Sequence, residues 1–508
     1  MKLRSAHSLA LRAVLGASLI AFAGCDFAPP YAGPEIAVPE KFKDSAPLGP
    51  KVTLTEDWWR DFHDGELDRL ETLIETDNPD YAAALAQYER AKALLDLANS
   101  GFFPTVIGLP DVSYNKQSQN RPLRSADQPT YYGSNQLFGQ FAWEVDIWGR
   151  VKDVVAASKA GAQANDDLLA ATRLSLHATM ARTYIALRGI DAQAALLVRT
   201  IKLYQLALDL TEQRLKDNIA PPIDVERAKV QLANAKALAA QIAQSRAVLE
   251  NALAALGGRT ASLFRIPVSS AQPATPRLPR MAPASLLVRR PDVAAKERLL
   301  NVANEQIGAA KADFLPRFYI LMGGGTQSTN LDLLNFQNSL WNYGPALSMP
   351  IFDGGLRQAN LDAARAQFST AAAEYKGSII TAYQEVENAL ASIKWLRIQS
   401  AALSDAAKAA ERALDMAMSL YKDGAASSLD VVTAQSAALD AQRADLVAKS
   451  NVLEQYVELM LALGGGWSGQ APAPEAPFPP PVALLGPQGQ DPGAQPQPMQ
   501  AAPGGQRR

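Results

Sequence analysis

Two stretches of the chain carry an apolar residue every three or four positions over unusual lengths. The first runs from Val151 to about Asp217 and the second from Leu356 to about Asp423, and neither contains a proline. At a rise of 1.5 Å per residue, a helix of roughly 65 residues is about 100 Å long. A periodic pattern much longer than 25 residues is typical of a coiled coil, a membrane span or a helical repeat.

The first stretch fits a coiled coil better than a membrane span. Charged residues such as Asp166, Arg173 and Arg182 interrupt it too often for the hydrocarbon of a bilayer. Positions spaced by seven, with a second set interleaved by four and three, form the a/d seam of a coiled coil. The two sets are Met180, Leu187, Ala194, Ile201, Leu208 and Leu215, and Leu176, Thr183, Ile190, Leu197, Tyr204 and Thr211. On this stretch alone, a long helix in a cytosolic scaffold is the alternative.

Ahead of each long helix the period changes to two, which is the side-chain period of a β-strand. The two regions are 104–147 and 316–352. Their alternating apolar residues are Phe141, Trp143, Val145 and Ile147 in the first region, and Trp341, Tyr343, Leu347, Met349 and Ile351 in the second. Each region is therefore predicted to form two strands joined by a loop.

The second half of the chain repeats the first. Phe314-Leu315-Pro316 corresponds to Phe102-Phe103-Pro104, and Lys422-Asp423-Gly424 corresponds to Lys216-Asp217-Asn218. Through most of the match the offset is about 206 residues, as from Lys216 to Lys422, which is too consistent for chance. We predict a mainly helical α+β chain made by tandem duplication of a helix, two strands, a long helix and a return helix.

These patterns divide the chain into six segments. They are a signal peptide at 1–24, an extended tether at 25–57, a first repeat at 58–258 with a long hairpin at 149–256, a linker at 259–283, a second repeat at 284–466 with a long hairpin at 354–463, and a tail at 467–508. The tail is rich in Pro, Gly and Gln and is expected to be disordered, because it cannot bury enough apolar surface. The first return helix is expected to begin at about Asp224, which can cap it, and to end at Leu256.

Residues 1–24 have the basic start and the short apolar core of a secretory signal. They end in Phe22-Ala23-Gly24-Cys25, which resembles a bacterial lipobox, so Cys25 is the predicted lipid anchor. An ordinary cleavage site beside an incidental cysteine is the alternative. Asp26 resembles an inner-membrane retention signal, so the anchor alone does not fix the location. Two acyl chains would hold the chain firmly to a bilayer, whereas one chain would be marginal.

Composition excludes several function classes. The formal net charge of the 508 residues is -2, and the sequence shows no basic patch interleaved with aromatic residues. Nucleic-acid binding is therefore not predicted. Because Cys25 is the only cysteine, no intramolecular disulfide can form. The three histidines, His7, His63 and His177, suggest neither a catalytic set nor a metal site. We expect no cofactor, and we interpret the glycines at 323–325 as a turn rather than a phosphate-binding loop.

Four predicted strands cannot close a barrel within one chain, and an open sheet would leave two unsatisfied edges in a membrane. Single-chain barrels begin near eight strands. Two chains would give eight strands and a lumen filled by side chains, whereas three would give twelve strands and room for a pore. A soluble hairpin packed on the coiled coil is the alternative. Trp143, Trp148, Trp341 and Tyr343 suit an aromatic girdle, while Pro345 has no explanation from spacing.

Several motifs, in order, resemble TolC-like outer-membrane efflux proteins over about residues 20–466. Leu287-Val288-Arg289-Arg290-Pro291-Asp292-Val293 is followed by a spaced set that completes the signature of that family. The spaced set is Glu297, Gly308, Ala310, Asp313, Phe314 and Pro316, and further matching motifs are Trp58-Trp59 with Phe62, Asn78-Pro79 and Pro350-Ile351-Phe352-Asp353-Gly354-Gly355. With the lipobox, the chain is most similar to the lipoprotein branch that serves resistance-nodulation-division pumps.

The resemblance implies a homotrimer in the outer membrane of a Gram-negative bacterium. Three chains would share a twelve-stranded transmembrane β-barrel on a long periplasmic α-helical barrel. The implied partners are outer-membrane lipid, a periplasmic adaptor protein and an inner-membrane resistance-nodulation-division transporter. The implied function is a passive exit duct for drugs or other small compounds, without enzymatic activity.

The same resemblance places a gate where each long helix turns back. Asp430 and Thr433 would lie on the second hairpin, where the family often has an aspartate at the position of Thr433. Asp224 and Arg227 occupy the matching places of the first hairpin. We hypothesise that Asp430 of one hairpin pairs with Arg227 of an adjacent one, although Asp224 and Asp430 could simply be helix caps. Asn218 and Gly424, which tolerate left-handed backbone, mark the turns where an adaptor would dock.

Other functions stay open from the sequence. One is the outer-membrane duct of a type I protein secretion system, and another is a periplasmic coiled-coil protein without a pore. The lipobox and the Arg289-Arg290-Pro291-Asp292-Val293 stretch favour the drug efflux duct. The transported compounds and the identity of the pump and adaptor do not follow from this chain.

Overall fold

The computed structural model describes residues 27–30, 33–34, 42–43, 54–121, 125, 127–277 and 289–469. The predicted signal peptide, the predicted lipid anchor Cys25 and the predicted tail after residue 469 lie outside these ranges. The chain separates into two units, 1–468 and 469–508.

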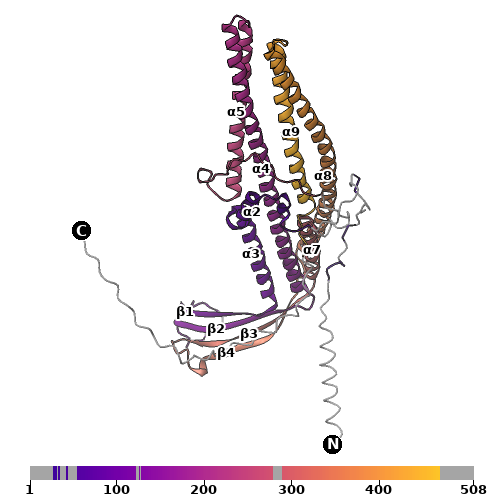
Figure 1. Cartoon of the computed structure of the whole chain (residues 1–508). Helices are drawn as coiled ribbons and strands as arrows, with labels where there is room; N and C mark the ends of the chain where they lie inside the picture. Colours follow the sequence, from indigo (N-terminus) through magenta and orange to yellow (C-terminus); the bar gives the residue numbers. More distant parts are fainter. Residues whose placement is uncertain are drawn as a thin grey trace, which may run out of the picture. The chain divides into compact units, whose positions relative to one another are not determined.

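Both halves of the chain contain the order helix, two strands, long helix and return helix, and the first half has α2 as an additional helix (Figure 1). In the first half, α2 (Gly65–Asp77) and α3 (Pro79–Asn99) precede β1 (Thr105–Lys116), β2 (Tyr131–Val145), α4 (Arg150–Lys216) and α5 (Pro222–Leu256). In the second half, α7 (Pro291–Ala312) precedes β3 (Arg317–Ser328), β4 (Ser339–Ser348), α8 (Leu356–Lys422) and α9 (Ser428–Ala462). Short 3-10 turns are η1 (Trp58–Phe62), η2 (Ser100–Phe102), η3 (Ala261–Leu263) and η5 (Phe336–Asn338). The predicted duplication is confirmed.

The two long helices match their predicted bounds within one residue. α4 and α8 each contain 67 residues, which corresponds to about 100 Å. Each begins after a left-handed glycine, Gly149 at φ 75° and Gly355 at φ 92°, a conformation that glycine adopts without steric cost. Among the described residues, no helix is both long enough and apolar enough to cross a bilayer.

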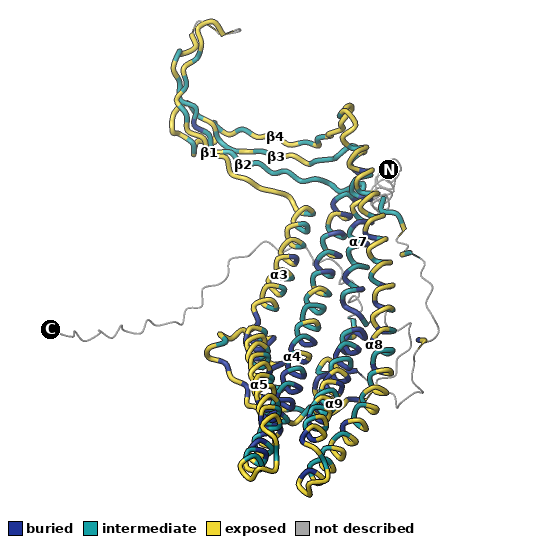
Figure 2. The backbone as a smooth tube through the Cα atoms, turned by 90° about the horizontal axis from the view of Figure 1, so that it is seen from above, coloured by how far each residue is buried: buried dark blue, intermediate teal, exposed yellow. Residues whose placement is uncertain are grey.

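The two long helices differ in how much of their surface is covered. α4 contacts α3, α5, α7 and α9, whereas the contacts of α8 are mainly with α7 and α9. Figure 2 shows this difference as buried colour along α4 and long exposed runs on α8. The exposed positions of α8 include Trp395 and Ile398, which are 61% and 56% exposed. α8 therefore presents an apolar surface that this chain alone does not cover.

The four strands form one antiparallel sheet in the order β1-β2-β3-β4. β2 pairs with β3 although they come from different halves of the chain. The predicted glycine turn at 323–325 is wrong, because these residues lie inside β3. Gly323 has no room for a Cβ atom, since the Phe138 ring and the Asn342 side chain occupy that space. Close approach of neighbouring side chains is a common reason for glycine within a strand.

The largest core lies where η1 and α2 pack against the middle of α4 and the end of α9. Trp58, Phe62, Leu70 and Tyr184 are all at most 1% exposed there. The aromatic motif at the start of the first repeat, Trp58-Trp59 with Phe62, therefore forms part of the core between α2, α4 and α9.

The linker between the repeats is docked along its described part. Phe264 and Ile266 are buried, and the backbone of Ile266 is bound on both sides by α5. Its N–H donates to Glu250 Oε1 at 2.8 Å and its carbonyl accepts from Arg246 Nη2 at 2.8 Å. Asp191 of α4, 1% exposed, accepts from Arg246 Nε at 2.7 Å, so this network joins α4, α5 and the linker.

Candidate functional site

The strand register separates the sheet into two chemically different faces, because residues directly opposite each other share a face. One face is mainly apolar and contains Val106, Pro110, Val112, Leu137, Phe141, Trp143, Val145, Phe318, Ile320, Met322, Trp341, Tyr343, Pro345 and Leu347. The other face contains Asp111, Ser113, Gln136, Gln140, Glu144, Arg317, Gln327, Asn342 and Ser348, with some apolar residues between them. Of the charged strand residues, Lys116 alone lies on the first face, at the end of β1. Such a sheet can separate an apolar environment from a polar one.

Each outer strand of this sheet carries one proline. β1 contains Pro110 and β4 contains Pro345, and each strand has a described partner on one side only. Proline cannot donate to a ladder and is therefore tolerated at a sheet edge. Pro345, which spacing left unexplained, thus lies on an outer strand of the sheet formed by the single chain.

Aromatic side chains gather at both ends of the strands. At the end that joins the helices, the indoles of Trp143 and Trp148 donate to the carbonyls of Phe102 and Pro316 at 3.0 and 2.7 Å. At the other end, Tyr114 and Tyr131 stack with ring centroids 6.3 Å apart. Trp341 and Tyr343 lie between the two ends, opposite Gly324 and Met322, and stack with ring centroids 5.6 Å apart. The predicted girdle residues thus lie at two levels of the sheet.

In each repeat, a joint connects the start of the helix before the strands to the end of the return helix. The side chain that precedes α3, Asn78, donates to the carbonyl of Leu256 at the end of α5 at 2.8 Å. In the second repeat, Arg290 precedes α7 and donates to the carbonyl of Ala462 at the end of α9 at 3.1 Å. One side chain thus satisfies a free carbonyl at a helix end in each case. These contacts assign a structural role to two of the sequence motifs.

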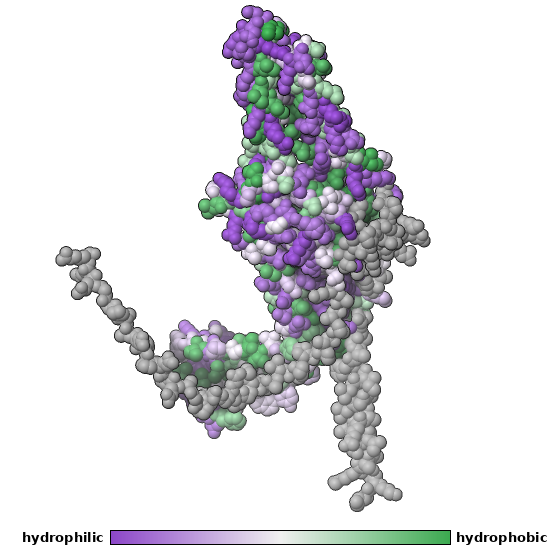
Figure 3. Space-filling view, viewed as in Figure 1, coloured by the Kyte–Doolittle hydropathy of each residue, from purple (hydrophilic) through white to green (hydrophobic). Residues whose placement is uncertain are grey.

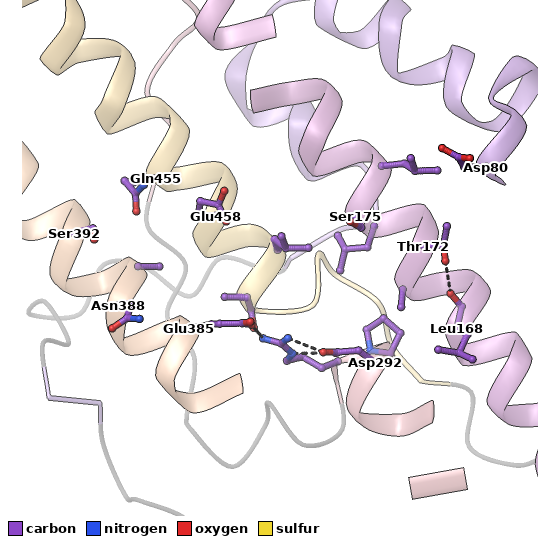
Figure 4. A pocket seen from close by; sticks show the side chains of 18 residues that line it. Asp80, Leu168, Thr172, Ser175, Asp292, Glu385, Asn388, Ser392, Gln455 and Glu458 are labelled. Carbon is purple, nitrogen blue, oxygen red and sulfur yellow. Dashed lines mark hydrogen bonds and ion pairs between the residues drawn. The ribbon is translucent and has the colours of Figure 1, made fainter. Parts of the chain in front are cut away.

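Arg290 also lies at the wall of a cavity of about 750 Å³ between α4, α7, α8 and α9 (Figure 4). Its guanidinium is 8% exposed and pairs with Asp292 at 2.7 Å and Glu385 at 2.6 Å. These bonds to two carboxylates raise the pKa of Arg290 against the opposing effect of burial. Arg290 therefore stays charged and ties the start of α7 to α8 and α9.

The turns at the hairpin tips have the backbone that the sequence predicts. Asn218 has φ 58° and Gly424 has φ 77°, both in the left-handed region. On the face shown in Figure 3, the ends of the hairpins are mainly hydrophilic. Both turns are thus sharp and exposed, and each joins two long helices.

The predicted gate residues make local contacts in the single chain. Arg227 pairs with Asp224 at 3.3 Å. Asp430 completes a capping box, since its carboxylate accepts from the Ser427 N–H at 3.0 Å and hydroxyl at 2.7 Å. The Ser427 hydroxyl and N–H lower the pKa of Asp430. Thr433 donates to the carbonyl of Leu429 at 2.8 Å. The single chain thus offers Asp430 and Arg227 partners within their own hairpins.

The predicted capping role of Asp224 is wrong. α5 begins at Pro222, so Asp224 is its third residue, and no side chain caps this helix. Proline at the start of a helix has a fixed φ that suits this position. Pro222, the second proline of the pair Pro221-Pro222, is therefore the first residue of α5.

Sequence reasoning missed a contact between the two hairpins near their tips. The Arg214 guanidinium of α4 lies 4.3 Å from the centre of the Tyr421 ring of α8. Its Nη2 also donates to the carbonyl of Lys422 at 3.1 Å. The helical period gives no sign of this pair, because the two residues lie in different repeats. Cation–π contacts of this kind hold the hairpins of one chain together.

His177 of α4 is buried against η1 and α2. Its Nδ1 lies 2.8 Å from Oε2 of Glu71, and both side chains are almost fully buried. The Trp59 ring stacks on the imidazole with centroids 4.3 Å apart. Burial and the nearby Arg173 lower the pKa of His177 to about 4, and burial raises the pKa of Glu71 well above its usual range. The pair is therefore neutral at neutral pH.

From this pair we predict that the variant Glu71→Gln loses stability at acid pH. Between pH 6.5 and 4.5, unfolding makes His177 gain a proton and Glu71 lose one, so the two contributions to stability cancel. In Glu71→Gln only the His177 contribution remains, and it falls as pH falls, because the folded-state pKa is below the ordinary 6.5. We expect a loss of about 2–3 kcal/mol per chain over this range, at 1.36 kcal/mol per pKa unit.

The measurement is the thermal midpoint of the detergent-solubilised protein at pH 6.5 and 4.5. Glu66→Gln, which alters an exposed acid on the same helix, is the matched control. Equal pH dependence in Glu71→Gln, Glu66→Gln and the unaltered protein would contradict the prediction.

In the described part of the chain, no group of three or more His, Cys, Asp or Glu side chains is arranged to hold a metal ion. The features brought together by the fold are instead a two-faced sheet, the two joints made by Asn78 and Arg290, and two exposed turns. All three suit a wall or conduit.

Comparison with known proteins agrees with this arrangement. Residues 72–259 and 282–465 match the outer membrane efflux protein family. Outer membrane protein OprJ of Pseudomonas aeruginosa is 30% identical over 450 residues, which cover 87% of this chain and 93% of OprJ. Antibiotic efflux pump outer membrane protein ArpC of Pseudomonas putida is 28% identical over 477 residues, covering 91% of this chain and 97% of ArpC.

A solved structure of the outer-membrane channel OprN resembles the fold with a TM-score of 0.82 at 27% identity. The match covers 88% of this chain and 100% of the OprN chain. The chain therefore belongs to the outer membrane efflux protein family. It is an outer-membrane channel protein of a Gram-negative bacterium, and its family is one of transport proteins rather than enzymes.

Proposed function

We propose that this chain is the exit duct of a tripartite efflux pump and conducts drugs or other small compounds passively out of the cell. The observation that carries the proposal is the two-faced, four-stranded sheet at the end of two long hairpins, within a family of outer membrane efflux proteins. An inner-membrane resistance-nodulation-division transporter supplies the energy, and a periplasmic adaptor links it to the turns at Asn218 and Gly424.

Three chains share one barrel in this proposal. An open sheet is not stable in a bilayer, because the backbone N–H and C=O groups at its edges would have no hydrogen-bond partners. Pairing β1 of one chain with β4 of the next gives twelve strands from three chains, a number that leaves an aqueous lumen. The apolar face, which includes Trp341 and Tyr343, then meets lipid. The exposed face of α8 packs on the neighbouring chain.

The experiment for the proposed function uses the purified full-length protein in planar lipid bilayers. Discrete conductance steps, from a particle whose measured mass is that of three chains, are the expected result. Absence of any conductance from a correctly inserted trimer, under conditions that also favour opening, would contradict a duct. Loss of exported proteins rather than of drug resistance in a deletion strain would favour the secretion alternative.

We also propose that Cys25 carries the lipid that anchors the chain to the outer membrane. The lipobox at 22–25 supports the modification, and two acyl chains give stable anchoring. Cys25→Ser is expected to abolish labelling with an alkyne analogue of palmitate. Label that persists in the variant would show that another residue is acylated.

The gate proposal pairs Asp430 of one hairpin with Arg227 of a neighbouring chain. A solvent-exposed pair of this kind contributes only about 0–1 kcal/mol, but threefold symmetry repeats it. We expect Asp430→Ala to raise conductance and to admit vancomycin at a normal trimer level. Asp224 and Thr433 lie within one turn of these residues and complete the proposed rim.

Ser427→Ala is the matched control for the gate. It removes the hydroxyl contacts of the capping box but keeps the Asp430 carboxylate and the backbone N–H that donates to it. If conductance rises equally in both variants, the cap rather than the ion pair keeps the tip closed. If neither variant changes conductance, the gate proposal is wrong.

A further inference from the structure

The N-terminal tether has a defined seat on the second repeat. Lys311 Nζ of α7 donates to the carbonyl of Phe27 at 3.0 Å, and Asn304 Nδ2 donates to the carbonyl of Pro29 at 2.9 Å. Between them, a Cβ atom on Gly308 would lie 2.7 Å from the backbone nitrogen of Ala28, so only glycine leaves room for the tether. We call Asn304, Gly308 and Lys311 the tether seat.

The seat places the start of the described chain at the end of α7 that joins the sheet. Lys311 is in the last turn of α7, and β3 begins at Arg317. Cys25 is two residues before Phe27 in the sequence, and two residues of extended chain span at most about 7 Å. A short segment therefore connects the residue proposed to carry the lipid to the corner where α7 meets the sheet.

An exposed apolar ledge occupies the same corner. It consists of Phe314, Met349, Ile351 and Phe352, which are 38%, 58%, 93% and 90% exposed. Ser348, just before Met349, pairs with Arg317 at the start of β3.

Phe314 closes the other side of this corner. It lies three residues after Lys311, and the Arg357 guanidinium is 5.6 Å from its ring centre. Because Arg357 belongs to the first turn of α8, the ledge is bounded by the ends of α7 and β4 and the start of α8.

A group of exposed apolar side chains usually marks a surface that binds an apolar partner. We propose that the ledge binds the acyl chains carried by Cys25 and that the tether seat holds them against it. The inference rests on the lipid modification proposed above. The chain end that bears the lipid is within reach, and residues 349–352 contain no charged side chain that would oppose contact with hydrocarbon. Seat and ledge both belong to the second repeat, so the anchor enters the bilayer beside β3 and β4.

The test is light-driven crosslinking in the full-length protein in cells fed an alkyne analogue of palmitate. p-Benzoylphenylalanine replaces Phe352, and in a matched control it replaces Phe336, which is 87% exposed at the opposite end of β4. Mass spectrometry is expected to find the 352 peptide joined to the acyl-bearing N-terminal peptide. The control is expected to give no such product.

Two results distinguish failure of the ledge inference from failure of the proposed lipidation of Cys25. If the palmitate label is present but residue 352 crosslinks only to a second copy of the chain, or not to the acyl peptide, the ledge inference is wrong while lipidation stands. If the label is absent from the unaltered protein, both fail.

A second pair of variants tests the seat. Lys311→Ala with Asn304→Ala is expected to reduce the crosslink at residue 352 several-fold. Lys296→Ala alters another lysine of α7, which pairs with Glu374 at 2.8 Å away from the seat, and should leave the yield unchanged. Equal yields in all variants would show that the seat does not hold the anchor.

Discussion

Leu137→Arg is expected to remove the protein from the outer membrane. Leu137 is in the middle of β2, on the apolar face, and 51% exposed in the single chain. An arginine that faces lipid near the middle of the bilayer costs about 2–4 kcal/mol per chain in a membrane barrel. A trimer would bear that cost three times, so the heat-modifiable trimer band in outer-membrane fractions should be lost or strongly reduced.

Gln136→Arg is the matched control, because it makes a similar change one residue away. Gln136 pairs with Asp111 and Gln327 on the other face of the sheet, which the account places in the aqueous lumen. We expect a normal trimer band from this variant. If Gln136→Arg is lost and Leu137→Arg is tolerated, the assignment of the two faces is reversed.

Asp191→Ala is expected to give the largest loss of stability in the helical body. The Asp191 carboxylate is buried and pairs with Arg188 at 3.1 Å and Arg246 at 2.7 Å. It also accepts from the N–H of Ser269 in the linker at 3.2 Å. Removing one partner of a buried ion pair costs about 3–5 kcal/mol, because the remaining charge is left uncompensated. We expect a lower thermal midpoint and easier proteolysis of the linker.

Asp209→Ala controls for the loss of a carboxylate on the same helix. Asp209 is exposed and accepts a hydrogen bond from Gln205 at 2.9 Å. Surface changes of this kind usually alter stability by less than about 0.5 kcal/mol. A thermal midpoint of Asp191→Ala equal to that of Asp209→Ala would mean that the linker network does not stabilise the fold.

The helices and strands were predictable because their signals are local and long. An uninterrupted helical period marked α4 and α8, and a period of two marked the strands. The glycines at 323–325 misled the interpretation, since glycine usually signals a turn. Their reason is tertiary: in β3, Gly323 leaves space for the Phe138 ring from the neighbouring strand.

The candidate site was predictable only where the residue type indicates a left-handed backbone conformation. Asn218 and Gly424 lie at left-handed turns, as expected. Arg214 and Tyr421, like His177 and Glu71, are brought together from distant segments, and no periodicity marks such pairs. The proposed pairing of Asp430 with Arg227 between chains stays a prediction, because it depends on an assembly rather than on one chain.

The central claim is that this chain is an efflux duct, and drug susceptibility of a deletion strain tests it most directly. We expect the deletion strain to be hypersensitive to several unrelated antibiotics and dyes, and the unaltered gene to restore resistance. Complementation by Cys25→Ser in the same assay would show that the barrel, rather than the lipid, directs insertion. Unchanged susceptibility in a strain that also lacks other ducts of this family would contradict the account.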